Sequence, residues 1–187
     1  MWSRHLFRKA FMTLSVLMVF SLTGTVDAWP KNQDKASPFE GKLIEVKGIH
    51  LNVFDQGEGE VVLLLHGMPD TLNVWRNQIP VLLKAGYRVV APDMIGYGKS
   101  EKPKELDHYT TANVEKDLLT LIDKLGLKNM NLIGHDWGAI IGWDLVSFYP
   151  ERFKRYVALS VGHPIPAFGQ LSTDAIAVNW YMFLDAL

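Results

Sequence analysis

The chain has 187 residues, of which 48% are hydrophobic and 21% are charged, and its formal net charge at pH 7 is −1. This length and composition predict one folded globular domain and exclude disordered, collagen-like and repeat-built chains. The sequence has no cysteine, which excludes disulfides, thiol nucleophiles and thiolate metal sites, and it has no basic run that would suit nucleic acid. Any nucleophile must therefore use oxygen or nitrogen, and we expect no metal site and no cofactor.

The first 28 residues are typical of a secretory signal peptide. Arg4, Arg8 and Lys9 precede thirteen mostly apolar residues (10–22), and the small residue Ala28 suits cleavage after it. The apolar run is shorter than the ~20 residues that a membrane-spanning helix needs. We therefore expect a secreted or periplasmic domain with no stable membrane span after cleavage. An uncleaved N-terminal membrane anchor is the alternative, because Asp27 is not ideal in a cleavage site.

The next segment leads from a linker into a predicted hairpin. Residues 29–41 are polar and contain two prolines, which favours a linker or an extended arm. Residues 43–47 and 50–55 then alternate apolar and polar side chains on either side of Gly48. This alternation predicts a hairpin of two half-buried strands.

Four apolar runs predict the central strands of a parallel sheet, because strands buried on both faces need apolar side chains at most positions. These runs are residues 61–65, 87–91, 130–133 and 156–161. Between them, residues 111–125 have apolar side chains at helical spacing, and residues 137–149 are apolar on most sides, so both are predicted to be helices. The order of elements predicts an α/β fold with a mostly parallel sheet and flanking helices, whose ligands bind at the carboxyl ends of the strands.

The chemistry is predicted to lie at Asp136, which stands between Gly134 and Gly138, directly after a predicted strand and before a predicted helix. A Gly-x-Asp-x-Gly sequence in this setting fits a strained turn that presents the central side chain at the tip of the sheet. The positive end of the helix dipole favours an ionised carboxylate there. We therefore predict Asp136 as a catalytic nucleophile. The alternative is that its side chain only caps the helix.

A second motif, His66-Gly67-Met68-Pro69, follows the most hydrophobic predicted strand. In this architecture an oxyanion hole uses the N–H of the residue after the nucleophile and an N–H from the loop after the third strand. Those two groups would be the backbone N–H groups of Trp137 and Met68. The alternative for the His66 motif is a plain turn.

Three stretches in this order resemble the α/β-hydrolase superfamily, and within it the branch of epoxide hydrolases and haloalkane dehalogenases. They are residues 66–76 (HGMPDTLNVWR), 91–100 (APDMIGYGKS) and 134–139 (GHDWGA). The similarity extends over roughly residues 41–187. It implies an α/β-hydrolase fold that acts on a small apolar epoxide or alkyl halide. It also implies that Asp93 and Gly96 belong to a structural turn outside the active site.

An aspartate nucleophile changes the reaction that this fold is expected to catalyse. A carboxylate that attacked an ester would form an anhydride, whereas attack on a saturated carbon forms an alkyl ester that water can cleave at its carbonyl. The substrate should therefore carry an electrophilic alkyl carbon. Opening an epoxide would give a diol, and displacing a halide would give an alcohol.

The leaving group distinguishes the two enzymatic interpretations, because an epoxide oxygen needs a proton donor and a halide does not. Residues 178–184 resemble the first cap helix of epoxide hydrolases, which implies that Tyr181 contacts the substrate and donates a proton to the epoxide oxygen. Packing within the cap is the alternative role for this tyrosine. Related dehalogenases use the indole after the nucleophile, here Trp137, and often an asparagine after His-Gly, where this chain has Met68. Epoxide hydrolysis is therefore the leading interpretation, and haloalkane dehalogenation is the alternative.

The sequence departs from the family in its general base. In this fold an acid and then a histidine follow the nucleophile, but the 51 residues after Asp136 contain a single histidine, His163, just past the predicted sixth strand. His135 is expected to point away from the attacked face, and His66 is expected to support its own loop. None of these histidines is a convincing base.

We therefore expect a chain that stops inside the cap. Residues 42–166 would form the N-terminal part of the hydrolase core, and residues 167–187 would form the start of the cap domain. Residues 156–161 would then be an exposed apolar sheet edge. A chain of this kind would be inactive as an enzyme or slow in the second step, because a positioned base commonly contributes ~10² to 10⁴-fold. A non-catalytic remnant or pseudoenzyme that binds an apolar ligand is the third interpretation.

Overall fold

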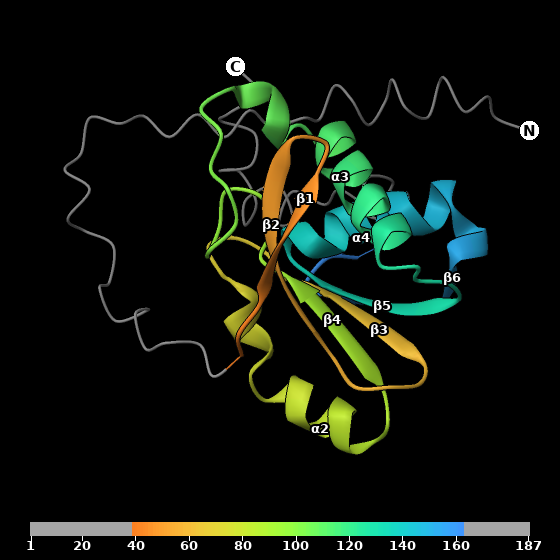
Figure 1. Ribbon diagram of the computed structural model, residues 1–187. Helices are drawn as coiled ribbons and strands as arrows, with labels where there is room; N and C mark the ends of the chain where they lie inside the picture. Colours follow the sequence, from red (N-terminus) through yellow and green to blue (C-terminus); the bar gives the residue numbers. More distant parts are fainter. Residues whose placement is uncertain (1–38, 163–187) are drawn as a thin grey trace, which may run out of the picture. The chain divides into compact units, whose positions relative to one another are not determined.

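The computed structural model describes residues 39–162 of the chain (Figure 1). Several predictions concern residues outside this range: the signal peptide (1–28), most of the linker (29–41), the start of the cap (167–187), His163 and Tyr181.

Six strands form one mixed sheet in the order β1-β2-β4-β3-β5-β6. Their bounds are β1 Lys42–Val46, β2 Ile49–Gln56, β3 Val61–Leu65, β4 Arg88–Pro92, β5 Met130–His135 and β6 Phe153–Leu159. β1 and β2 form the predicted hairpin, and β2 runs antiparallel to β4. The pairings of β3 with β4, β3 with β5 and β5 with β6 are parallel, which confirms the predicted fold class.

Helices and short 3-10 turns connect these strands. Their bounds are η3 Leu72–Trp75, α2 Gln78–Lys84, η4 Leu106–Tyr109, α3 Thr111–Lys124, α4 Trp137–Phe148 and η5 Pro150–Arg152. α3 and α4 confirm the two predicted helices, and they lie on one face of the sheet, with α2 on the other (Figure 1). Within residues 39–162, no helix is both long enough and apolar enough to cross a membrane.

Two hydrophobic clusters hold the helices to the sheet. On one face, Leu63, Leu65 and Leu132 pack with the buried side chains of α3 and α4. On the other face, Val62 and Leu64 pack with α2 and η3. Because successive side chains of a strand point to opposite faces, β3 contributes to both clusters, as β2 and β4 also do.

The prediction that four central strands are buried on both faces holds for β3 and β4 but is wrong for β5 and β6. In β5 the side chains on the α3/α4 face are buried and those on the α2 face are half-buried. In β6, Val157 and Leu159 are 47% and 39% exposed. Within the described residues α2 covers the side of the sheet near β3 and β4, so the α2 face of β5 and β6 is more open.

The last strand also begins three residues earlier than predicted, at Phe153 instead of position 156. Lys154 and Arg155 interrupt the apolar pattern, which is why the sequence did not indicate a strand there. Both side chains reach Glu60 on the segment before β3, at 2.9 Å and 3.5 Å, so their charges are paired at the sheet end. The strand ends before Ser160, which has a φ of 67°.

The turn after β4 is built around the buried carboxylate of Asp93, as the family resemblance implied. One oxygen accepts the Leu72 N–H at 2.7 Å, and the other accepts the Asn52 side-chain amide at 2.8 Å and the Lys99 N–H at 2.9 Å. A Cβ at Gly98 would lie closer than 3.0 Å to this carboxylate. Asp93 therefore fastens β2, η3 and its own turn together, and its role is structural.

Replacing Asp93 with alanine should destabilise the fold strongly. The substitution takes the acceptor from two buried donors, the Leu72 N–H and the Asn52 side-chain amide, and from the partly buried Lys99 N–H. Each unsatisfied buried donor typically costs about 1–3 kcal/mol, so the expected loss in the free energy of unfolding is at least ~2 kcal/mol. Urea denaturation measures it. Asp123→Ala is the control, because that carboxylate is exposed and pairs with Arg152 at the surface, where an ion pair contributes ~1 kcal/mol or less. Equal losses in the two variants would contradict the structural role of Asp93.

Candidate active site

Asp136 occupies the turn between β5 and α4 with φ 52° and ψ −119°. This left-handed conformation is rarely adopted by residues other than glycine and costs ~1–3 kcal/mol, which the surrounding structure must offset. The carbonyl oxygen of Asp136 accepts the N–H groups of Ala139 and Ile140 at 2.8 Å and 3.0 Å, so the helix starts at this residue. The Asp136 side chain makes no capping hydrogen bond. The alternative of a helix-capping side chain is therefore wrong.

The two glycines that flank Asp136 are required by close approach of the backbone. A Cβ at Gly134 would lie closer than 3.0 Å to the carbonyl of Gly138, and a Cβ at Gly138 would lie closer than 3.0 Å to the carbonyls of Leu65 and His66. Real Cβ atoms essentially never approach other atoms so closely. The first turn of α4 therefore packs directly on the end of β3.

The loop after β3 brings Met68, one of the two predicted oxyanion residues, to the side chain of Asp136. The Met68 N–H donates a hydrogen bond of 2.9 Å to Oδ1 of Asp136. A Cβ at Gly67 would lie closer than 3.0 Å to the Asp136 side chain, so glycine is needed for this approach. Trp137 is the first residue of α4, and the N–H of a first helical residue has no acceptor within its own helix. The structure thus brings Asp136, Met68 and Trp137 together.

Tyr97 also lies at this site, although the sequence analysis did not single it out. Its ring packs edge-on against His66 with a centroid distance of 5.7 Å. Burial raises the pKa of the Tyr97 phenol, and the negative charge of Asp136 raises that pKa further. An aromatic residue between Gly96 and Gly98, inside one of the three family-like stretches, was the signal that could have identified it.

The histidines near Asp136 are placed as predicted. Both ring nitrogens of the buried His66 are engaged, with the Gly67 carbonyl and the Met94 N–H. His135 ends β5 on the same face as Ile133, which packs with the α2 cluster, so its side chain leaves the strand on the face opposite α4. Its buried Nδ1 has no hydrogen-bond partner within the described part of the chain.

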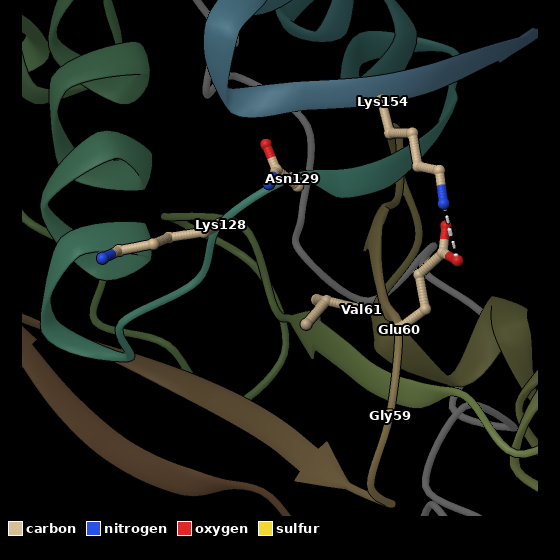
Figure 2. A pocket seen from close by; sticks show the side chains of 6 residues that line it. All are labelled: Gly59, Glu60, Val61, Lys128, Asn129 and Lys154. Carbon is tan, nitrogen blue, oxygen red and sulfur yellow. Dashed lines mark hydrogen bonds and ion pairs between the residues drawn. The ribbon is translucent and has the colours of Figure 1, made fainter.

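A depression of about 470 Å³ lies elsewhere, at the amino ends of the parallel strands (Figure 2). Lys128 and Asn129 line it just before β5, and in Figure 2 Lys154 points toward Glu60 while Lys128 points away. Asp136 follows the carboxyl end of β5, so this depression is at the other end of the sheet and takes no part in the candidate active site. Within residues 39–162, no cluster of three or more histidine or acidic residues could hold a metal ion.

Comparisons with known proteins agree with this geometry. The model of the alpha/beta hydrolase fold family matches residues 60–184. The chain belongs to the α/β-hydrolase fold family. It is 45% identical over 118 residues to an epoxide hydrolase of Caballeronia sordidicola, covering 63% of this chain and 36% of the relative. It is 40% identical over 131 residues to bifunctional epoxide hydrolase 2 of Sus scrofa, covering 70% and 24% respectively.

Solved structures give the same result. A crystal structure of an epoxide hydrolase from Vigna radiata matches with a TM-score of 0.64 and 44% identity, covering 73% of this chain and 47% of the other. The epoxide hydrolase of Bacillus megaterium matches with a TM-score of 0.70 and 34% identity, covering 75% and 50%. The predicted resemblance to the epoxide hydrolase branch is confirmed. This hydrolase chain spans half or less of the length of these four relatives.

Gly138→Ala should lower the free energy of unfolding by about 1–3 kcal/mol, because the new methyl group forces α4 away from β3. Thermal or urea unfolding measures the change. Gly162→Ala is the matched control, since a Cβ there meets nothing within 4 Å, and its effect should stay within about 0.5 kcal/mol. If Gly138→Ala were as stable as the control, the close packing of this turn on β3 would be disproved.

Proposed function

We propose that Asp136 is the nucleophile of an epoxide hydrolase and that it reacts through an alkyl ester. A carboxylate oxygen of Asp136 bonds to an epoxide carbon as the carbon–oxygen bond of the ring breaks. The electron pair of that bond goes to the epoxide oxygen, which takes a proton from an acid, for which we propose Tyr181. Water then attacks the ester carbonyl, and the bond from the acyl carbon to the alkyl oxygen breaks. One proton of the water ends on that alkyl oxygen and the other returns to the Tyr181 phenolate, so the products are a diol, the free carboxylate and neutral tyrosine.

The observation that carries this proposal is the hydrogen bond from the Met68 N–H to Oδ1 of Asp136. It engages one carboxylate oxygen and leaves Oδ2 to attack. After the attack, Oδ1 is the carbonyl oxygen of the ester, and it becomes the oxyanion when water adds. Met68 and Trp137 are then the N–H donors of the oxyanion hole, in which loss of one donor typically costs ~3 kcal/mol.

Two observations favour an epoxide over an alkyl halide as the substrate. The two relatives and two solved structures described above, at 34–45% identity, are named epoxide hydrolases. In addition, the side chain after His66-Gly67 is that of Met68, a thioether that has no N–H to donate to a departing halide.

We also propose that the ester persists in the 187-residue chain. The two nitrogens of His66 are occupied by backbone groups, and His135 leaves β5 on the face opposite α4. Within the described residues, neither histidine is therefore placed to take a proton from the attacking water. Attack by Asp136 itself needs no such base, because an ionised carboxylate is already the nucleophile.

Incubation of the chain with styrene oxide should add the mass of one epoxide molecule, and peptide mapping should place it on Asp136. The adduct should survive for at least ~100 times longer than in an epoxide hydrolase with a positioned base, because neither His66 nor His135, among the described residues, is placed to take a proton from water. Intact-mass spectrometry over time measures both quantities.

Asp136→Asn, which removes the nucleophile, and Asp107→Asn, which alters an exposed carboxylate, are the controls. The first variant should give no adduct and the second should react like the parent chain. Soluble, folded parent protein that stays unmodified would overturn the nucleophile assignment and favour a non-catalytic ligand-binding protein. Release of halide from matched alkyl halides, without adduct formation from the epoxide, would favour a dehalogenase.

We further propose that residues 1–28 direct export and are removed after Ala28. Expression in a bacterium should then give a periplasmic product whose N-terminus is Trp29, as measured by intact mass and N-terminal peptide sequencing. A full-length product in the membrane fraction would support the uncleaved anchor instead.

A further inference from the structure

We propose that His66 is a positioning residue that orients the N–H of Met68 toward Asp136 and links it to the Asp93 turn. The catalytic meaning of this inference rests on the proposed function, but the hydrogen-bond arrangement itself can be tested without any reaction.

The surroundings of His66 permit one protonation state. The side chain is completely buried, its Nδ1 lies 2.8 Å from the Gly67 carbonyl oxygen, and its Nε2 lies 2.8 Å from the backbone nitrogen of Met94. A carbonyl oxygen can only accept, and a backbone N–H can only donate. Nδ1 must therefore carry the proton and Nε2 must be bare. The ring is neutral, with a donor at one end and an acceptor at the other.

The Nδ1–H of His66 donates to the peptide group between Gly67 and Met68, whose N–H is the proposed oxyanion donor. The Gly67 carbonyl and the Met68 N–H belong to the same planar peptide group. The carbonyl accepts from His66 Nδ1 and from the Asp70 N–H at 3.0 Å, while the N–H donates to Asp136. Rotation of this peptide plane would break both sets of bonds together. His66 thus fixes the direction in which the Met68 N–H points.

The acceptor end of His66 is held by the rigid turn after β4. Met94 directly follows Asp93, whose carboxylate binds Asn52, Leu72 and Lys99. Hydrogen bonds therefore run from the Met94 N–H through the imidazole and the Gly67–Met68 peptide to Asp136, and the buried Asp93, covalently next to Met94, anchors their far end. The loop at Gly67 and Met68 is therefore held by His66 and by the Asp93 turn, which lies much further along the chain.

Protonation of His66 would disrupt this set, because a second N–H at Nε2 would face the N–H of Met94. Burial is the main cause that lowers the pKa of His66, and the charge of His135 lowers it further, whereas the hydrogen bond to Gly67 and the charges of Asp93 and Asp70 raise it. The folded pKa lies below the unfolded value of 6.5, so the unfolded chain takes up this proton first. The contribution of His66 to stability is complete above pH 6.5 and is lost as the pH falls below that value.

Two-bond ¹H–¹⁵N NMR of the full chain, labelled with ¹⁵N-histidine, tests the arrangement directly. His66 should show a protonated Nδ1 and a bare Nε2, and its pKa in the folded chain should lie below the unfolded value of 6.5. A proton on Nε2, or titration with an ordinary pKa near 6.5, would overturn the inference.

Alkylation by styrene oxide tests the positioning role. His66→Phe removes both polar ends, and the rate of Asp136 alkylation should fall by up to about 100-fold, as expected for a misplaced reacting group. His66→Asn keeps a donor near Nδ1 and should recover part of the rate. Ile122→Val, a core substitution in α3 that leaves these hydrogen bonds intact, is the control for general destabilisation and should react like the parent chain.

The outcomes of the two experiments are distinguishable. Folded His66→Phe that reacts at the parental rate would overturn the positioning role. An unreactive parent chain would instead contradict the proposed function, and the NMR result would still decide the state of His66. If His66→Phe does not fold, the His66→Asn variant and the NMR measurement carry the test.

Discussion

The hydrogen bond between the Met68 N–H and Oδ1 of Asp136 is the contact on which the candidate active site depends. It joins two segments that are 68 residues apart in the chain, the loop after β3 and the turn before α4. The sheet makes it possible, because β3 and β5 are parallel neighbours and therefore end at the same edge. Because only Oδ1 accepts this hydrogen bond from Met68, the two oxygens of the Asp136 carboxylate have different surroundings. The proposed reaction uses this difference, since one oxygen attacks the substrate and the other becomes the carbonyl oxygen of the ester.

Close packing around that contact explains much of the local sequence. Gly67, Gly134 and Gly138 each stand where a side chain would collide with backbone or with the Asp136 side chain. Asp136 itself has a φ of 52°, a strained conformation that persists only where packing of the neighbouring elements fixes the backbone. The strain is offset by the burial of β3 between α2 on one face and α4 on the other. The chemical site and the hydrophobic core are thus consequences of the same packing.

The fold and the nucleophile turn could be predicted because their signals are local: apolar runs, helical spacing and glycines beside Asp136. Features that depend on distant residues could not be. The early start of β6 could not be predicted, because the charges of Lys154 and Arg155 hide the strand pattern and their partner, Glu60, lies 94 residues before Lys154. α2 was missed because it is only seven residues long and contains Pro80, which is tolerated in its first turn. The sequence also did not indicate the hydrogen bond between Met68 and Asp136 or the bond between Met94 and His66, because each joins segments far apart in the chain.

The most direct test of the Met68–Asp136 contact is the pH dependence of the Met68 amide resonance in the folded chain. If the N–H donates to the carboxylate, its proton shift should move as Asp136 titrates, and this movement should vanish in Asp136→Asn. A Met68 amide shift that ignores the protonation of Asp136 in the parent chain would contradict the contact, and with it the assignment of the nucleophile.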